Sequence, residues 1–415
     1  MRSVEQATEV VRWCRRLATL SETAGETTRR FLTKPMREVH TALATWMARV
    51  GMAVRVDAIG NIHGVYPPQA SRVPMAAAPR FFIGSHLDTV PNAGAFDGVL
   101  GVVMGIALVE MLGDRHLPFG IEVVGFSDEE GVRFGTPFLG SHALAGTFDP
   151  SQLDLRDGQG RTLRDVIRDF GLEPSRIPDA QAPSSAIGYL EFHIEQGPVL
   201  ENLNLPLAVV DVVAGQSRAA VTFTGRSGHP GTTPMKLRKD AVTGAAAWII
   251  EVEREAMSTP GLVATVGSIE VEPGAGNVIA GRSTLSIDVR HPADQMRKAA
   301  FERLIKAAEE IAARRGLQVA WESRLDQPSV PMDQTLASML DRAIEQAGFP
   351  AHRVTSGAGH DAMVVAGRMP AAMMFLRCEN GVSHHPAENV REDDVAAALE
   401  AGLKFLDEVA RVPRG

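Results

Sequence analysis

Two short apolar runs, each followed directly by polar residues, decide the fold: FFIGSHLD at residues 81–88 and IEVVGFSDEE at residues 121–130. Between them, residues 99–112 form a Gly-punctuated apolar stretch that predicts a helix. A strand, a helix and a second strand in this order are typical of an α/β sheet, in which ligands bind beyond the carboxyl ends of the strands. The polar residues that end both runs are therefore expected at the ligand-binding edge of the sheet.

The flanking sequence predicts the rest of this domain. Apolar residues recur at helical spacing over residues 5–20 and 35–50, and residues 54–56 and 59–65 predict two short strands. Residues 67–79, rich in Pro and Ala, predict an exposed loop.

After residue 213 the pattern changes to that of a smaller α+β unit. Its predicted strands cover residues 219–224, 263–271 and 283–289, and its predicted helices cover residues 239–257 and 293–315. The earlier pattern then returns, with a helix at 332–348, a buried strand at 371–376 and a closing helix at 391–409. We therefore expect an α/β domain, with a mixed sheet flanked by helices, at 1–213 plus 331–415, and an inserted α+β domain at 214–330.

The length and the net charge of the chain limit the classes of protein to which it can belong. With 415 residues and 44.5 kDa the chain exceeds one ordinary hydrophobic core, so two domains are expected. The 42 basic and 50 acidic residues give a net charge of -8, which argues against nucleic acid as a partner. The longest apolar run, residues 99–109, is too short to span a membrane.

The first residues and the cysteines favour a reducing compartment. Residues 1–16 mix charged and apolar side chains and lack the apolar core of a secretory signal. Cys14 and Cys378 cannot make a disulfide framework and lack metal-ligand spacing. We expect a cytoplasmic protein in which any metal is bound by His and carboxylate.

Five clusters combine these ligand types at predicted strand ends or loops: His86 with Asp88, Asp97, Glu129 with Glu130, His193 with Glu195, and His384 with His385. Such donors suit zinc, manganese, cobalt or nickel, and a site with two ions about 3.5–4 Å apart needs a bridging carboxylate. Asp97, next to a glycine just before a predicted helix, fits the bridge. Each cluster alone also has a structural explanation, since a lone His is commonly a satisfied core residue and Asp before Gly commonly forms a turn.

Together these segments resemble the metal-dependent amidases of the hydantoinase/carbamoylase type, within the wider dinuclear-metal group that includes aminoacylases and aminopeptidases. The resemblance runs from about Gly25 to the end of the chain, in the order GSHLDTV (84–90), FDGVLGV (96–102), SDEEG (127–131), FHIEQGP (192–198) and SHHPAE (383–388). The FHIEQGP string is specific to the amidase branch.

The resemblance implies a role for each matching residue. The ligands of two divalent ions, most simply zinc and alternatively manganese, cobalt or nickel, would be His86, Asp97, Glu130, His193 and His384. Asp97 would bridge the ions, and His86 and His193 would bind one ion each or share sites with the other two ligands. Asp88 would orient His86. Glu129 would be the base that takes a proton from the attacking water and passes it to the leaving nitrogen. Either His384 or His385 could be a ligand by chemistry alone, and alignment on Ser383 and Pro386 favours His384.

The resemblance also implies substrate-binding residues. His229, in a Gly/Pro loop, would reach across a dimer interface to stabilise the oxyanion. Asn277 and Arg290 would hold a substrate carboxylate together with Gln196. Asn277 could instead be a turn residue, and Arg290 a surface charge at a strand end. Gly359 and His360 would line the pocket, unless His360 and Asp361 only cap the following helix.

The implied reaction is hydrolysis of the ureido C–N bond of an N-carbamoyl-L-amino acid by a homodimer. Allantoate and 3-ureidopropionate are alternative substrates, and an aminoacylase, an aminopeptidase or a metal-free binding protein are alternative functions. Residues 28–35 depart from the expected N-terminal segment of the best-known carbamoylases, which leaves the identity of the ureido acid open.

Overall fold

The structure is a computed structural model that describes residues 2–68 and 78–412. It divides into two compact units, one comprising Met1–Asp211 and Met332–Gly415 and the other comprising Val212–Pro331. Most of the loop expected at 67–79 lies outside the described residues.

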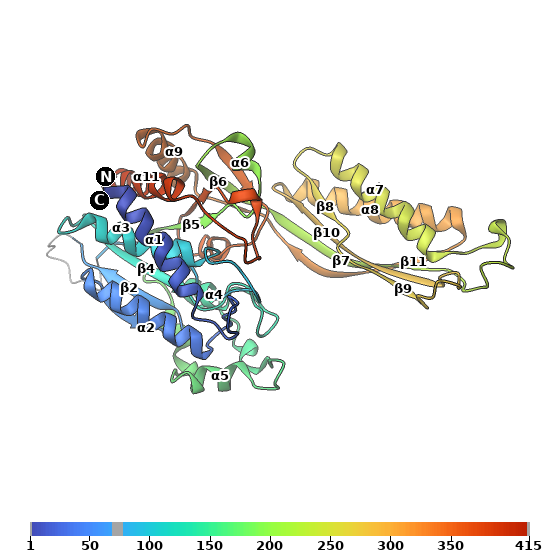
Figure 1. The fold of residues 1–415 in the computed structure, drawn as a ribbon, viewed down its shortest axis with the longest axis horizontal. Helices are drawn as coiled ribbons and strands as arrows, with labels where there is room; N and C mark the ends of the chain where they lie inside the picture. The colour runs from blue at the N-terminus through green and yellow to red at the C-terminus, as the bar shows by residue number, and fades with distance from the viewer. Residues whose placement is uncertain (1, 69–77, 413–415) are drawn as a thin grey trace. The chain divides into compact units, whose positions relative to one another are not determined.

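The larger unit is built on a mixed sheet with the strand order β1-β2-β4-β3-β5-β14-β6, and β13 pairs with β6 beside this path (Figure 1). The strands are β1 (Ala53–Val56), β2 (Ile62–Tyr66), β3 (Arg80–His86), β4 (Gly120–Phe126), β5 (Ala186–Ile194), β6 (Leu207–Val213), β13 (Arg353–Ser356) and β14 (Ala371–Leu376). Four adjacent strands, β4, β3, β5 and β14, run parallel, so their carboxyl ends meet at one edge. The short β12 (Val330–Pro331) pairs with the end of β6 where the inserted unit ends.

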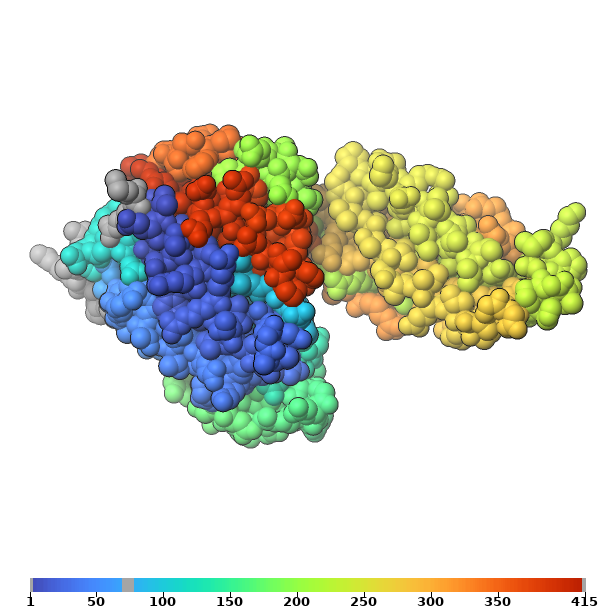
Figure 2. All heavy atoms as spheres, viewed as in Figure 1, coloured from blue at the N-terminus to red at the C-terminus, as the bar shows by residue number. Residues whose placement is uncertain are grey.

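Helices cover this sheet. The longer ones are α1 (Arg2–Ala18), α2 (Lys34–Arg49), α3 (Val99–Leu112), α9 (Gln334–Gln346) and α11 (Glu392–Arg411). The short ones are α4 (Leu139–Ala145), α5 (Leu163–Asp169), α6 (Val199–Leu203) and α10 (Asp361–Val365), together with the 3-10 turns η1 (Pro150–Asp154), η2 (Pro174–Ala180) and η4 (Glu379–Gly381). Figure 2 shows α1, in blue, beside the red C-terminal segment that includes α11, and the two helices are in contact.

Helix α3 lies in the middle of the core. Every residue of α3 except Glu110 is buried, which explains its uniformly apolar sequence. It approaches the sheet so closely that a side chain at Gly101 would lie 2.3 Å from the carbonyl oxygen of Phe192 in β5. Glycine at this position therefore lets the helix that follows Asp97 pack directly on the strand that carries His193.

The smaller unit is an antiparallel sheet with the order β11-β7-β10-β8, and β9 also pairs with β10. Its elements are β7 (Gly215–Thr224), η3 (Met235–Leu237), α7 (Ala241–Ser258), β8 (Val263–Thr265), β9 (Ile269–Glu272), β10 (Arg282–His291), α8 (Asp294–Arg315) and β11 (Gln318–Gln327). Alternate residues of β10 are buried in a core shared with α7 and α8. The other face of β10 presents polar residues, as expected for a sheet covered on one side.

The predicted fold class is confirmed, and several boundaries differ. The strand expected at 59–65 begins at Ile62, because Asp57 accepts main-chain hydrogen bonds from Ile59 and Asn61 and holds a turn there. The strand expected at 263–271 is two strands, β8 and β9. Strands β5, β6, β11 and β13 were not predicted.

Among residues 2–68 and 78–412, the structure contains no helix long and apolar enough to cross a membrane.

Candidate metal centre

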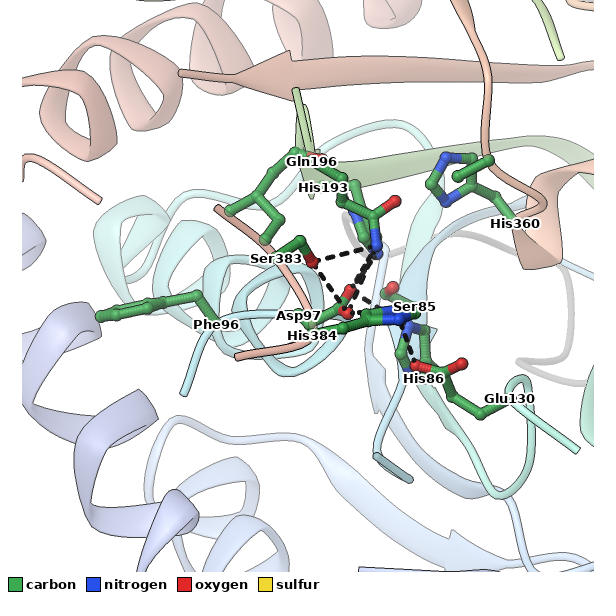
Figure 3. A network of polar contacts seen from close by, with 12 residues as sticks. Ser85, His86, Phe96, Asp97, Glu130, His193, Gln196, His360, Ser383 and His384 are labelled. Atoms are coloured by element: carbon green, nitrogen blue, oxygen red, sulfur yellow. Dashed lines mark hydrogen bonds and ion pairs between the residues drawn. The ribbon is translucent and has the colours of Figure 1, made fainter. Parts of the chain in front are cut away.

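The predicted ligands converge at the carboxyl edge of the four parallel strands. His86 is the last residue of β3, His193 lies one residue before the end of β5, and Glu130 and His384 follow β4 and β14. Asp97 lies in the loop that leads into α3. Figure 3 shows these five side chains turned toward one another around Asp97.

One group of candidate ligands consists of His86, Asp97 and His193, all buried. Nε2 of His193 lies 3.2 Å from Oδ1 of Asp97, and Nε2 of His86 lies 3.8 Å from the same oxygen. Each ring is held from behind, because Nδ1 of His86 is 3.0 Å from the carbonyl oxygen of Asp88 and Nδ1 of His193 is 2.9 Å from that of Ile194. These contacts turn Nε2 of each ring toward Asp97. Nε2 of His193 is buried and makes no hydrogen bond, as a ligand atom would.

A second group consists of Asp97, Glu130 and His384. Nε2 of His384 lies 3.2 Å from Oδ2 of Asp97 and 3.4 Å from Oε1 of Glu130. His385 is exposed, and its Nδ1 accepts the main-chain N–H of Ala387. The geometry thus selects His384 over its neighbour. Asp97 gives one oxygen to each group, which is the arrangement of a bridging carboxylate.

The charges of the site are balanced by protons on histidine. Burial alone would raise the pKa of Asp97, but its polar contacts with His193 and His384 outweigh burial and hold the pKa well below its usual value. Burial lowers the pKa of His193, yet Asp97 raises it to about 9. Hydrogen bonds to Asp97 and Glu130 raise the pKa of His384 to about 10. The buried carboxylates are therefore stabilised by positive charge nearby. Divalent cations would supply this charge in place of the protons, so the set of ligand atoms fits a metal.

Asp88 contacts His86 through its main chain. Its main-chain carbonyl, rather than its carboxylate, makes the hydrogen bond to His86, since Oδ1 is 3.7 Å from the ring. The carboxylate instead accepts the main-chain N–H groups of Glu129 at 2.9 Å and Glu130 at 3.1 Å. Asp88 consequently fixes the backbone of both glutamates. Glu129 is nearly buried and belongs to neither ligand group, and burial together with Glu130 raises its pKa well above the usual value.

Gln196, predicted to bind substrate, contacts a ligand in this structure. Its Nε2 donates to both carboxylate oxygens of Asp97, at 3.2 and 3.3 Å, and lies 3.3 Å from Oγ of Ser383 (Figure 3). Ser383 and Glu388 are two polar residues to which the sequence assigned no role. Both lie in the string that carries His384, so the string itself was the available clue.

His360 lies beside the first ligand group. Its ring centroid is 4.5 Å from that of His193 in an edge-on arrangement, and its Nε2 is 2.9 Å from Oγ of Ser356. The side chain makes no cap hydrogen bond to α10, so the helix-capping alternative does not describe it. The adjacent Gly359 packs against Phe138, whose ring would be 3.0 Å from an added Cβ.

Glu195 lies outside the ligand groups although it is two residues from His193. Its carboxylate accepts the main-chain N–H groups of Val199 and Leu200, at 2.8 and 3.0 Å, and so caps α6. Its role is structural.

Two residues of the candidate metal centre have an uncommon backbone conformation. Gln196 and His384 have positive φ values of 58° and 55°, an uncommon conformation for residues other than glycine. Gly98, with φ of 68°, carries the ring of His86 directly on its α-carbon, because an added Cβ would lie 2.4 Å from that ring. Such strain is commonly found at functional sites.

In the smaller unit, two predicted residues lie close to each other. The loops of His229 and Asn277 are joined where the N–H of Ile279 donates to the carbonyl of Gly228 at 2.8 Å. His229 and Asn277 are both exposed, and their loops lie near the start of β10.

Arg290 lies near the opposite end of β10. Its guanidinium is held by Asp288, at 2.8 and 2.9 Å, and Arg218 binds the same carboxylate at 2.7 Å. Two cations therefore contact one carboxylate on the open face of the sheet. Arg290 lies eight positions after Arg282, the first residue of β10. Arg290 is therefore about 26 Å along the strand from the end that adjoins the loops of His229 and Asn277.

Two overlapping His/carboxylate groups at the carboxyl edge of four parallel strands are typical of a metal-dependent hydrolase. The sequence profile of peptidase family M20/M25/M40 matches residues 82–408, and the chain belongs to this family. The predicted class of enzyme, a hydrolase acting on non-peptide C–N bonds, is confirmed.

Relatives in sequence and structure agree on the amidase branch. The chain is 37% identical over 385 residues to an N-carbamoyl-L-amino acid amidohydrolase of Geobacillus stearothermophilus, covering 91% of this chain and 92% of that protein. It is 37% identical over 436 residues to an allantoate deiminase of Arabidopsis thaliana, covering 96% and 82%. The crystal structure of a hydantoinase/carbamoylase family amidase from Burkholderia multivorans has a TM-score of 0.91 and 31% identity, and 98% of each chain is covered. The predicted family resemblance is confirmed.

Proposed function

We propose that this protein hydrolyses the ureido C–N bond of a small ureido acid, releasing ammonia and carbon dioxide, with two divalent ions bound by His86, Asp97, Glu130, His193 and His384. The observation that carries the proposal is the pair of ligand groups sharing Asp97, with Glu129 beside them and outside both. Zinc is the first candidate and manganese, cobalt and nickel are the others, because imidazole and carboxylate serve all of them.

The chain's own residues divide the chemistry among them. When bound, the ions supply Lewis acidity that polarises the ureido carbonyl and lowers the pKa of water. Glu129 takes a proton from the attacking water and delivers it to the departing nitrogen as the C–N bond breaks. Asp88 holds the backbone of Glu129 and so sets where this proton is received.

Arg290 is the residue we assign to the substrate carboxylate. The guanidinium presents paired donors that match a carboxylate, and it lies with Arg218 around Asp288 on the open face of the sheet. An N-carbamoyl-L-amino acid is the first candidate. Allantoate is the second, because the relatives named for the two substrates are equally identical to this chain.

The smaller unit also supports a shared site in a homodimer. We assign Asn277 and Arg290 to one substrate carboxylate, yet they lie near opposite ends of β10. A single copy of this unit cannot bring both to one small molecule, since about 26 Å separates the two ends. We therefore infer that His229 and Asn277 come from the partner subunit.

One edge of the smaller unit fits such a dimer. The exposed apolar residues Ile250 and Met257 of α7 (54% and 85% exposed), Val263 of β8 (60%) and Ile269 of β9 (47%) belong to consecutive elements, and β8 and β9 lie at the sheet edge opposite β11. A patch of this kind on an edge is typical of a protein interface. We also infer a cytoplasmic location, which the two buried cysteines without a disulfide support.

The experiment that tests the function is ammonia release by metal-reconstituted protein from N-carbamoyl-L-amino acids, allantoate and 3-ureidopropionate. Dipeptides and N-acyl amino acids are assayed in parallel by amine release, and a chelated sample is the control. Chelator-sensitive ammonia release from one ureido acid would support the proposal and identify the substrate. Cleavage of only the dipeptides or N-acyl compounds would replace it with an aminopeptidase or aminoacylase.

The shared site is tested by subunit mixing. His229→Ala and Glu129→Gln homodimers should both be inactive. After subunit exchange at equal amounts, about a quarter of the wild-type activity should return, because half of the dimers are mixed and each contains one intact site. Exchange confirmed by differently tagged subunits without recovery would contradict the shared site.

A further inference from the structure

Glu388 is a buried carboxylate that binds the backbone of the loop carrying Asp97. Its Oε1 accepts the main-chain N–H of Phe96 at 2.8 Å and that of Asp97 at 3.0 Å. Only 4% of the residue is exposed. Because two amides converge on one oxygen, a shift of this carboxylate would shift the α-carbon of the shared ligand.

The second oxygen of Glu388 links this loop to the loop of His384. Oε2 accepts a hydrogen bond from Oγ of Ser383 at 3.3 Å, and the same hydroxyl lies 3.3 Å from Oδ2 of Asp97. Ser383 directly precedes His384. Glu388 thus connects two of the three loops that supply ligands to the second group, without belonging to either group itself.

Tight packing keeps Glu388 in place. A Cβ added at Gly94 would lie 2.3 Å from Cβ of Glu388 and 2.4 Å from its Oε1, so the backbone of the Asp97 loop lies directly on the carboxylate. The glutamate can neither withdraw nor turn without moving this loop.

The two ligand groups depend on this support to different degrees. In the first group, His86 and His193 come from β-strands and each ring is fixed by a main-chain carbonyl. In the second group, His384 comes from an irregular loop, has a positive φ and has a side chain that is 49% exposed. Its position relative to Asp97 is set mainly by the contacts between the two loops.

We propose that Glu388 is a positioning residue that holds Asp97 and His384 in register, so that the second ligand group is formed before an ion binds. The inference rests on the proposed two-ion function. It predicts that loss of Glu388 weakens the ion of the second group more than that of the first, because the first group keeps two histidines that are fixed on β-strands.

The test is calorimetric titration of metal-depleted protein with Mn²⁺, which reports the number of ions and the affinity of each independently of any substrate. Glu388→Ala should weaken the ion of the second group at least tenfold and the ion of the first group by a clearly smaller factor. Glu388→Gln, which keeps an acceptor for both amides, should retain both ions. Low-temperature electron paramagnetic resonance should show the spin coupling of a manganese pair in the wild type and in Glu388→Gln, and should show isolated Mn²⁺ in Glu388→Ala.

Glu195→Ala is the matched control. Glu195 also accepts two main-chain N–H groups close to a ligand, but these belong to α6. This variant should bind both ions normally. Should Glu388→Ala fail to fold, Ser383→Ala removes the link to Glu388 together with the hydroxyl contacts to Asp97 and Gln196, and should weaken the same ion by a smaller factor.

Two results would overturn the proposal: unchanged affinity for both ions in folded Glu388→Ala and Ser383→Ala, or equal weakening of both ions. A wild-type protein that binds fewer than two ions would instead refute the two-ion function. Two ions bound without ureido hydrolysis would refute the proposed substrate and leave the role of Glu388 intact.

Discussion

The larger unit contains two buried clusters that combine histidine with carboxylate, and they differ in how completely their polar atoms are paired. The cluster around Asp97 lies at the carboxyl edge of the parallel strands. The other cluster is centred on His63 in β2 and Glu122 in β4. In both clusters the sequence places histidine and acidic residues on or beside strands. Only the cluster around Asp97 has the properties of a binding site.

Every polar atom of the His63 ring has a partner. Nδ1 lies 2.9 Å from Glu122 and Nε2 lies 3.1 Å from Asp57, while Arg55 and Arg80 each donate to Glu122 at 2.8 Å. The charges alternate and nearly cancel. Burial would lower the pKa of His63, but both acids outweigh it and raise the pKa. Burial likewise opposes ionisation of Glu122, yet His63 and the arginines bring its pKa down to about 2.

The cluster around Asp97 is incomplete by comparison. Nε2 of His193 has no hydrogen bond, and Glu129 and Glu130 lie close together without an arginine or lysine ion pair among the described residues. Buried groups of one charge are costly unless something neutralises them. Histidine and carboxylate occur in both clusters, so their presence alone does not indicate a metal centre. What distinguishes the metal centre is that it contains polar atoms without partners and carboxylates without an arginine or lysine to neutralise them.

The largest effect should separate the two clusters by activity. Glu129→Gln should lower turnover about 10²–10⁴-fold with metal content unchanged, because the proton acceptor is lost and the ligands remain. The matched variant Glu122→Gln should keep its turnover per folded molecule and lose stability instead. Steady-state kinetics and metal analysis measure both. If Glu129→Gln also lost metal, Glu129 would be a ligand and the division of roles between the two glutamates would be wrong.

The second prediction concerns stability. His63→Gln should lower the free energy of unfolding by about 3–5 kcal/mol, since it leaves Asp57 and Glu122 buried without their shared cation. His40 is the control, because it is also buried but burial lowers its pKa to about 4, so it is neutral. His40→Gln should cost clearly less. Urea unfolding followed by circular dichroism compares them, and an equal loss in both would show that size and not charge explains the effect.

The sequence predicted the Asp97 cluster because its ligands follow recognisable strands. The apolar runs of β3, β4 and β14 place His86, Glu130 and His384 at strand ends, and parallel pairing brings those ends together. Strand β5 was missed because Glu191 and His193 interrupt its apolar pattern, although both are buried. Strand β11 was missed because an edge strand exposed along most of its length, QVAWESRLDQ, shows no alternation.

Other features could not be read from the sequence because they are contacts between distant segments. Glu388 bonds to residues 291 and 292 positions away, so its place in the SHHPAE string indicated the site but not its partners. The role of Asp88 depends on which of its oxygens faces His86, and a spacing cannot show this. The separation of Arg290 from Asn277 followed only from the register of β10. The spacing of residues in the sequence predicts which side chains lie at the same edge of the sheet. Which of their atoms contact one another can be seen only in the structure.

The third prediction uses the metal itself. If the Asp97 cluster lacks positive charge, ions that bind only the folded state should stabilise it, by about 2.7 kcal/mol for one ion at a hundred times its dissociation constant. His63→Gln should gain as much from metal as the wild type, because its defect lies outside the ligand groups. Asp97→Asn should gain little, since the carboxylate shared by both groups loses its charge and one of its two oxygens. Thermal unfolding with and without Zn²⁺ or Mn²⁺ measures these gains, and a normal gain in Asp97→Asn would contradict the bridging role.

The smallest effect should appear in the pH dependence of stability, because two histidines act in opposite directions. The folded-state pKa of His63 is raised, so its contribution is complete below about pH 6.5 and is lost as the pH rises through the folded-state pKa. The folded-state pKa of His40 is lowered to about 4, so its contribution is complete above about pH 6.5 and is lost as the pH falls toward 4, where the unfolded chain binds the proton first. In chelated protein, His40→Gln should flatten the acidic limb of the stability curve and His63→Gln the alkaline limb. Denaturant unfolding across this range tests both, and an acidic limb unchanged in His40→Gln would place the acid sensitivity in the carboxylates of the Asp97 cluster.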